Sequence, residues 1–128
     1  MEKKELVICD TNILIEVIDR NNKKIIESLV KIGKGNLCIS SITYSELLIG
    51  AANKLHRSKL LAKVDKFILI PINLKIDQLH RGLINQYSLS HKLSIQDALI
   101  ASTAPHYDIE LLTINVKDFK FIKGIKLI

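Results

Sequence analysis

The most informative stretch of this sequence is LVICDTNILIEVI, residues 6–18. Its first four residues are apolar, which is typical of a short β-strand that is buried on both faces. Asp10, Thr11 and Asn12 follow directly, and an apolar helical stretch then continues to Ile18. A buried strand that passes straight into a helix indicates the first unit of an alternating α/β fold.

The rest of the chain continues this alternation. Further strands are predicted over residues 37–39, 67–70 and 111–113, with a short fifth strand over 125–128. Helices are predicted over 23–32, from Ser40 or Ser41 to about residue 56 with Leu55 on the apolar face, and over 57–67, 75–91 and 95–104. Such alternation implies right-handed crossovers and a parallel sheet covered by helices on both faces. The 128 residues suffice for one compact domain, residues 1–128, and are too few for two.

The composition is that of an ordinary globular protein with a basic surface. Apolar residues make up 48% and charged residues 25% of the chain, and Lys and Arg exceed Asp and Glu by 19 to 13, a net charge of +6. This charge favours a polyanionic partner such as RNA or DNA, although a solvated lysine-rich surface explains it equally well. Lys suits backbone phosphates better than base edges. The candidate phosphate contacts are Lys54, Arg57, Lys59, Lys63, Lys66, Lys117, Lys120 and Lys123.

Several other kinds of site are disfavoured. The apolar run near the N-terminus is too brief for a signal peptide or a membrane span, so we expect a cytoplasmic protein. Cys9 and Cys38 end apolar strand-like runs, so we expect buried, reduced thiols and no zinc site. No metal-ligand spacing relates the four histidines, which we expect at the surface or at helix ends: His56, His80, His91 and His106.

Acidic and amide side chains recur where predicted strands end or helices begin. Asp10 follows the first strand, Glu46 lies in the first turns of the helix after the second strand, and Asp97 lies in the first turn of a later helix. Asn115 and Asp118 follow the strand over residues 111–113. Ligands of parallel sheets bind beyond the carboxyl ends of the strands, so these side chains can share one pocket. Oxygen ligands suit Mg²⁺ or Mn²⁺, and the pattern therefore points to a metal-dependent nuclease.

Each acidic residue also has an ordinary structural explanation. Asp10 is a favourable N-cap. Glu46 fits a capping box with Thr43, and Asp97 fits one with Ser94. The surroundings of Asp97 favour a ligand, because its helix is apolar over most of its surface and a buried carboxylate needs a partner.

Together these fragments resemble the PIN-domain ribonucleases, and among them the small VapC-type toxins of bacterial and archaeal toxin–antitoxin pairs. The resemblance covers nearly the whole chain and rests on four motifs in order: Asp10-Thr11-Asn12, Ser45-Glu46-Leu47, Asp97-Ala98-Leu99-Ile100-Ala101 and Leu112-Thr113-Ile114-Asn115-Val116-Lys117-Asp118-Phe119. It implies a three-layer α/β/α sandwich around a parallel sheet of about five strands. It also implies a homodimer that cleaves RNA and is inhibited by a small antitoxin, a segment of which lies across the active site.

The resemblance implies that Asp10, Glu46 and Asp97 bind Mg²⁺ or Mn²⁺. Family members often have Asp where this chain has Asn115, and Asn adds no negative charge. Either Asp118 supplies a further carboxylate or the site works with three acids, and both alternatives remain open.

The expected reaction is hydrolysis of an RNA phosphodiester bond by a metal-activated water. Acidic side chains in one pocket repel one another, which raises their pKa values until a divalent cation relieves the repulsion. We expect Thr11, Asn12 and Thr113 to hold the metal ligands in place. One alternative is a phosphatase with Asp10 as nucleophile, although such enzymes commonly have a second acid where Asn12 stands. Another is a catalytically silent domain that binds RNA or a protein partner, which the Asn115 difference makes conceivable.

Overall fold

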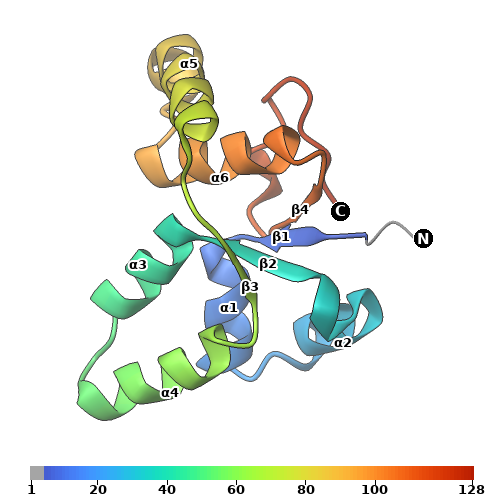
Figure 1. Cartoon of the computed structure of the whole chain (residues 1–128), viewed down its shortest axis with the longest axis vertical. Coiled ribbons are helices and arrows are strands. Elements are labelled where there is room, and N and C mark those ends of the chain that lie inside the picture. The colour runs from blue at the N-terminus through green and yellow to red at the C-terminus, as the bar shows by residue number, and fades with distance from the viewer. Residues whose placement is uncertain (1–4) are drawn as a thin grey trace.

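The computed structural model describes residues 5–128. Within that range, four parallel strands form one sheet in the order β3-β2-β1-β4 (Figure 1). The strands are β1 (Val7–Cys9), β2 (Leu37–Ser40), β3 (Ile68–Ile70) and β4 (Glu110–Leu112). The same range contains six α-helices: α1 (Thr11–Ile18), α2 (Lys23–Ile32), α3 (Ser41–Ile49), α4 (Lys54–Val64), α5 (Leu74–His91) and α6 (Ile95–His106). It also contains two short 3₁₀ helices, η1 (Lys34–Asn36) and η2 (Val116–Asp118).

The alternation of side chains along the strands divides the interior into two cores. Ile8 and Cys38 face one side of the sheet, whereas Cys9 and Ile39 face the other. The α5–α6 core contains the first pair with Tyr87, Ala98, Ile100, Leu111 and Phe119. The α1–α4 core contains the second pair with Ile13, Leu14, Leu29, Leu47 and Leu60. Figure 1 shows α5 and α6 above the sheet and α1 and α4 below it, which confirms the predicted three-layer α/β/α sandwich.

The segment predicted as a fifth strand meets the sheet at a single point. Leu127 forms an isolated parallel bridge with Leu111 of β4, and the Ile128 N–H donates to the Leu111 carbonyl at 3.1 Å. A turn between the Ile122 carbonyl and the Ile125 N–H occupies the start of this segment, so little of it remains to pair with β4. The described sheet therefore has four strands rather than about five.

The break between α3 and α4 differs from the prediction, and α4 ends at Val64 rather than at residue 67. The helix expected to continue to about residue 56 ends at Ile49, and α4 begins directly after Asn53. The Asn53 side-chain oxygen accepts a hydrogen bond from the His56 N–H at 2.8 Å, so Asn53 caps a new helix. Leu55, predicted on the apolar face, follows this cap and is 82% exposed.

The strand order reverses at β1. From β1 the chain crosses to β2 and β3 on one side, and β4 later pairs with the other side of β1. Parallel sheets bind ligands at such a reversal of strand order. The Asp10 N–H donates to the Leu112 carbonyl at 3.0 Å, which holds the carboxyl ends of β1 and β4 together.

The structure also tests the expectations of buried cysteines and of no membrane-spanning helix. Cys9 and Cys38 are buried, free thiols, as predicted, and burial raises the pKa of the Cys9 thiol to about 12. In the part of the chain that the structure describes, no helix has the length and apolar character needed to cross a membrane.

Candidate active site

Asp10 lies between the end of β1 and the start of α1, where the strand order reverses. It is 3% exposed, and both of its carboxylate oxygens accept hydrogen bonds. The Thr11 N–H donates to Oδ1 at 2.7 Å, and the Thr113 hydroxyl donates to Oδ2 at 2.9 Å. The N-cap explanation is therefore confirmed, but the cap accounts for only one oxygen. Burial raises the pKa of Asp10, the two hydrogen bonds oppose this, and the nearby Asp118 charge adds to the rise.

Glu46 joins this network through the side chain of Thr11. The Thr11 hydroxyl donates to Glu46 Oε1 at 2.8 Å and lies 3.1 Å from the hydroxyl oxygen of Thr43. The capping-box explanation of Glu46 is wrong, because Ser40 caps α3 and Thr43 is a fully buried residue inside the helix. Sequence reasoning missed this contact of Thr43 with the site. Its position three residues before Glu46, on the same face of the helix, was the available signal.

Asp97 occupies the first turn of α6 and is partly buried. Its N–H donates to the Ser94 hydroxyl oxygen at 3.1 Å, so Ser94 caps this helix as predicted. Burial raises the pKa of Asp97 to about 6, and repulsion by Asp10, Asp118 and Glu46 contributes to the rise. The carboxylates of four chain segments are therefore close enough to influence one another.

Asn115 and Asp118 belong to the turn after β4. The Asn115 N–H donates to the Thr113 hydroxyl oxygen at 3.0 Å, and the Asp118 N–H donates to the Asn115 carbonyl at 2.9 Å. The turn continues as the 3₁₀ helix η2, in which residues three apart lie above one another. Asp118 raises the pKa values of both Asp10 and Asp97. Asp118 is thus the member of this pair whose charge reaches the other acids.

The acidic residues are gathered but do not form a closed metal cage. Among residues 5–128, no three His, Cys, Asp or Glu side chains are placed to hold one ion together. No ion pair in that range links Asp10, Glu46, Asp97 or Asp118 to a Lys, Arg or His. Asn12 is partly buried beside them, and its side chain makes no hydrogen bond with another described residue.

The predicted phosphate contacts separate into two groups. Lys117 and Lys120 are exposed on either side of Asp118. Lys54, Arg57 and Lys59 lie on α4, and none of the four acidic residues lines the groove that Lys59 borders.

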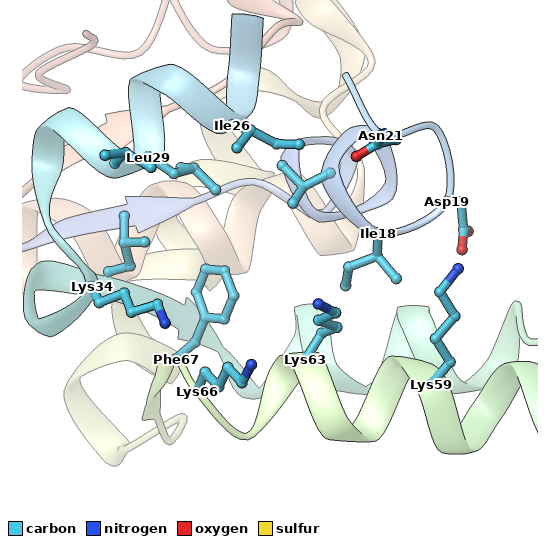
Figure 2. A pocket seen from close by; sticks show the side chains of 13 residues that line it. Ile18, Asp19, Asn21, Ile26, Leu29, Lys34, Lys59, Lys63, Lys66 and Phe67 are labelled. Atoms are coloured by element: carbon cyan, nitrogen blue, oxygen red, sulfur yellow. The ribbon is translucent and has the colours of Figure 1, made fainter. Parts of the chain in front are cut away.

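This groove, which we call the lysine groove, was not predicted from the sequence (Figure 2). It lies between α1, α2 and α4, and Ile18, Leu29 and Phe67 form part of its apolar floor. The lysines that line it are Lys34, Lys59, Lys63 and Lys66. Its lining comes from segments that are far apart in the chain, so no local pattern predicts the groove. The one available signal was the alternation of apolar residues and lysines along α4.

Comparison with known proteins identifies the family. The family model for the PIN domain matches residues 7–123. Ribonuclease VapC1 of Rickettsia felis is 35% identical over 102 residues, which cover 73% of this chain and 76% of that protein. The tRNA(fMet)-specific endonuclease VapC of Salmonella typhimurium is 32% identical over 124 residues, which cover 92% of each chain.

A solved structure agrees with these relatives. A toxin–antitoxin complex from Klebsiella pneumoniae contains a chain that is 29% identical, with a TM-score of 0.78 over 93% of this chain and 94% of that one. The sequence motifs, the sheet order and the relatives thus agree. The chain belongs to the PIN-domain family and, within it, to the VapC-type ribonuclease toxins of toxin–antitoxin pairs.

Proposed function

We propose that this ribonuclease is a metal-dependent endoribonuclease whose active site contains Asp10, Glu46 and Asp97, with Asp118 and Asn115 beside them. The observation that carries the proposal is the gathering of carboxylates without a cationic partner in residues 5–128. The raised pKa of Asp97, about 6, reflects burial together with repulsion among these groups. A bound cation would relieve that repulsion.

The donor set suits Mg²⁺ or Mn²⁺, because carboxylate oxygens are hard ligands. Mg²⁺ usually keeps several waters and is bound by only one or two carboxylates, so a cage of three converging ligands is not required. Asp10, Glu46 and Asp97 would hold the cation, directly or through water. When bound, such a cation makes a water more acidic and offsets charge on the phosphoryl oxygens.

The threonines around the carboxylates are proposed as positioning residues. Thr11 uses its N–H for Asp10 and its hydroxyl for Glu46, while the Thr113 hydroxyl orients the second oxygen of Asp10. Carboxylates that are held in one orientation need less reorganisation when ligand and RNA bind. Asn12, next to this network, is proposed to orient a ligand water.

RNA cleavage by the purified protein tests the proposal. We expect cleavage in Mg²⁺ or Mn²⁺ and none after chelation, and we expect Asp10→Asn, Glu46→Gln and Asp97→Asn each to lower the rate by orders of magnitude while the protein stays folded. Transfer RNA is the first substrate to test, because one relative is named as tRNA(fMet)-specific. Cleavage by Asp97→Asn at the wild-type rate would remove Asp97 from the site. RNA binding without any cleavage would favour the silent-domain alternative.

We also propose that the lysine groove binds the antitoxin. Its apolar floor and its four lysines suit an amphipathic helix with one apolar and one acidic face (Figure 2). A basic or aromatic segment of the same antitoxin would then cover the carboxylates. Lys63→Glu should weaken this complex, whereas Lys24→Glu, an exposed residue of α2 outside the groove, should not. Equal affinities in a pull-down titration would place the antitoxin elsewhere.

A homodimer is the proposed state of the free toxin, as the family resemblance implies. Large apolar side chains that remain exposed include Ile49, Leu74 and Ile95. Light scattering at micromolar concentration should therefore give twice the mass of one chain. A monomer under these conditions would contradict the proposal.

A further inference from the structure

Three of the four aromatic ring contacts within residues 5–128 meet at one place outside the carboxylate network. The His91 ring stacks on Phe121, with ring centroids 4.1 Å apart and ring planes at 12°. Tyr87 contacts both rings edge-on, at 5.1 Å from Phe121 and 5.6 Å from His91. This arrangement fixes the plane of the His91 ring, because two neighbouring rings support it.

The stacked pair is supported from inside and open to solvent outside. Tyr87 is buried in the α5–α6 core, and Phe121 packs against that core. His91 is exposed although one face of its ring lies on Phe121, so the opposite face is available to a ligand. The Ser90 hydroxyl lies 2.7 Å from His91 Nδ1 and further restricts the ring.

Both halves of the pair are connected by short segments to the acidic residues. Phe121 lies three residues after Asp118, so their Cα atoms are at most about 11 Å apart. His91 ends α5, and only three residues separate it from α6, whose first turn contains Asp97. His91 and Phe121 are therefore each joined to an acidic segment by a short stretch of chain.

The charges around the ring fit a nucleic acid. The exposed lysines on the two connecting segments are Lys92, Lys117, Lys120 and Lys123. Aromatic faces that stand among basic side chains are the usual features of single-stranded nucleic-acid sites, because every base has a face to stack and every nucleotide has a phosphate. An acidic peptide would match the lysines but would make no specific use of a flat, supported ring.

We propose that the exposed face of His91, supported by Phe121, stacks against a base of the RNA substrate and positions the strand at the carboxylates. The proposal rests on the proposed ribonuclease activity and adds a base-binding subsite to it. His91 would be a positioning residue, because it contacts the RNA but not the scissile phosphate.

Fluorescence tests the contact without requiring cleavage. The chain has no Trp, so His91→Trp in an Asp10→Asn background introduces a single indole at the platform. A short oligoadenylate should quench this indole, and the same oligomer with abasic sites should quench it much less. Leu89→Trp in the same background is the control, because Leu89 lies on the same helix and is 98% exposed. Equal quenching at both positions would overturn the proposal. So would a result in which a protein partner quenches the indole at position 91 and the oligoadenylate does not.

Cleavage kinetics supply the second readout in the protein with Asp10 intact. His91→Ala should raise KM about tenfold with little change in kcat, since one base stack typically contributes that much to binding. His91→Phe should restore KM because it keeps the ring, and Leu89→Ala should behave as wild type. A KM in His91→Ala equal to wild type, or an equal defect in His91→Phe, would overturn the stacking role. Failure of the ribonuclease proposal would look different, because the wild type would then bind RNA without cleaving it, or Asp10→Asn and Asp97→Asn would cleave at the wild-type rate.

Discussion

Thr11 connects two acidic residues of the candidate site. Its backbone N–H holds Asp10, and its hydroxyl donates to Glu46 at 2.8 Å. The single side chain therefore sets the position of Glu46 relative to Asp10. Such supporting hydrogen bonds typically change metal affinity by about 10- to 100-fold when they are lost.

Thr11→Val removes this hydroxyl while keeping the shape of the side chain and its backbone N–H. We expect Mn²⁺ affinity, measured by calorimetry, to fall about tenfold or more, and the free energy of unfolding to fall by about 1–2 kcal/mol because buried polar groups lose a partner. Thr11→Ser keeps the hydroxyl and should retain most of the affinity. Equal Mn²⁺ affinity in Thr11→Val and wild type would contradict a positioning role for this hydroxyl.

The carboxyl group of Asp97 predicts how stability depends on pH in the absence of metal. Its pKa is about 6 in the native state against an ordinary value of 3.8. The native state thus binds this proton more tightly than the unfolded state, so protonation stabilises the fold. This contribution is fully present below the ordinary value and is lost as pH rises through about 6.

We therefore expect the melting temperature of the chelator-treated protein to decrease relative to Asp97→Asn as pH rises across this window. The raised pKa of Asp10 acts in the same direction, whereas the lowered pKa of Glu16 acts in the opposite one. Comparison with Asp97→Asn isolates the contribution of the Asp97 carboxyl group to stability. Parallel melting curves for the two proteins across the window would show that Asp97 titrates normally.

At the level of elements, η2 and the residue before it contain the two candidates for a fourth site residue, Asn115 and Asp118. The 3₁₀ turn places residues three apart on one face, and Asp118 already raises the pKa values of Asp10 and Asp97. Asn115 contributes a backbone N–H to Thr113 and a carbonyl to Asp118. Both side chains can therefore face the carboxylates of Asp10 and Asp97.

Three substitutions in this turn separate the two residues. Asn115→Asp should preserve cleavage or tighten Mn²⁺ binding, because it adds a carboxylate beside the others. Asn115→Ala should reduce cleavage moderately, and less than Asp10→Asn does. Cleavage that is unchanged in Asn115→Ala but abolished in Asp118→Ala would show that Asp118, not Asn115, is the functional residue of this turn.

The elements also show which features can be read from sequence. β1 and β2 are short apolar runs with a polar residue at the end, and α2 spans the predicted residues up to Gly33, whose φ of 96° ends the helix. The break between α3 and α4 was misplaced, because helical apolar spacing continues through this region and only the Asn53 cap interrupts it. Apolar spacing thus predicts an element well unless a capping residue starts a new helix within the same spacing.

The sequence indicated which acidic residues lie at the candidate site, but it did not indicate the hydrogen bonds that hold them. Asp10, Glu46 and Asp97 stand at the ends or starts of elements, and a parallel sheet gathers such positions. The bonds from Thr11 to Glu46 and from Thr113 to Asp10 join residues far apart in the chain. They depend on how α1, α3 and β4 approach one another, which no local pattern specifies.

In the molecule as a whole, the acidic residues come from both layers of helices. Asp10 precedes α1 in one layer, and Asp97 begins α6 in the other (Figure 1). Without a cation, their mutual repulsion acts across the sheet edge where the two layers meet. A cation bound between them would replace that repulsion by attraction to a shared ion, so metal binding should stabilise the assembly of the layers.

Thermal unfolding with and without Mn²⁺ tests this coupling. Ligand at about 100 times its dissociation constant stabilises a native protein by about 2.7 kcal/mol, which raises the melting temperature of a domain of this size by several degrees. We expect this rise in wild type and a much smaller one in Asp10→Asn, because the substituted amide is a poorer ligand. Asp77→Asn replaces a half-exposed acid on α5 that pairs with Arg81 and not with the network, so this variant should respond as wild type does. An equal rise in all three proteins would place the metal site elsewhere, since only Asp10 among the replaced residues belongs to the carboxylate network.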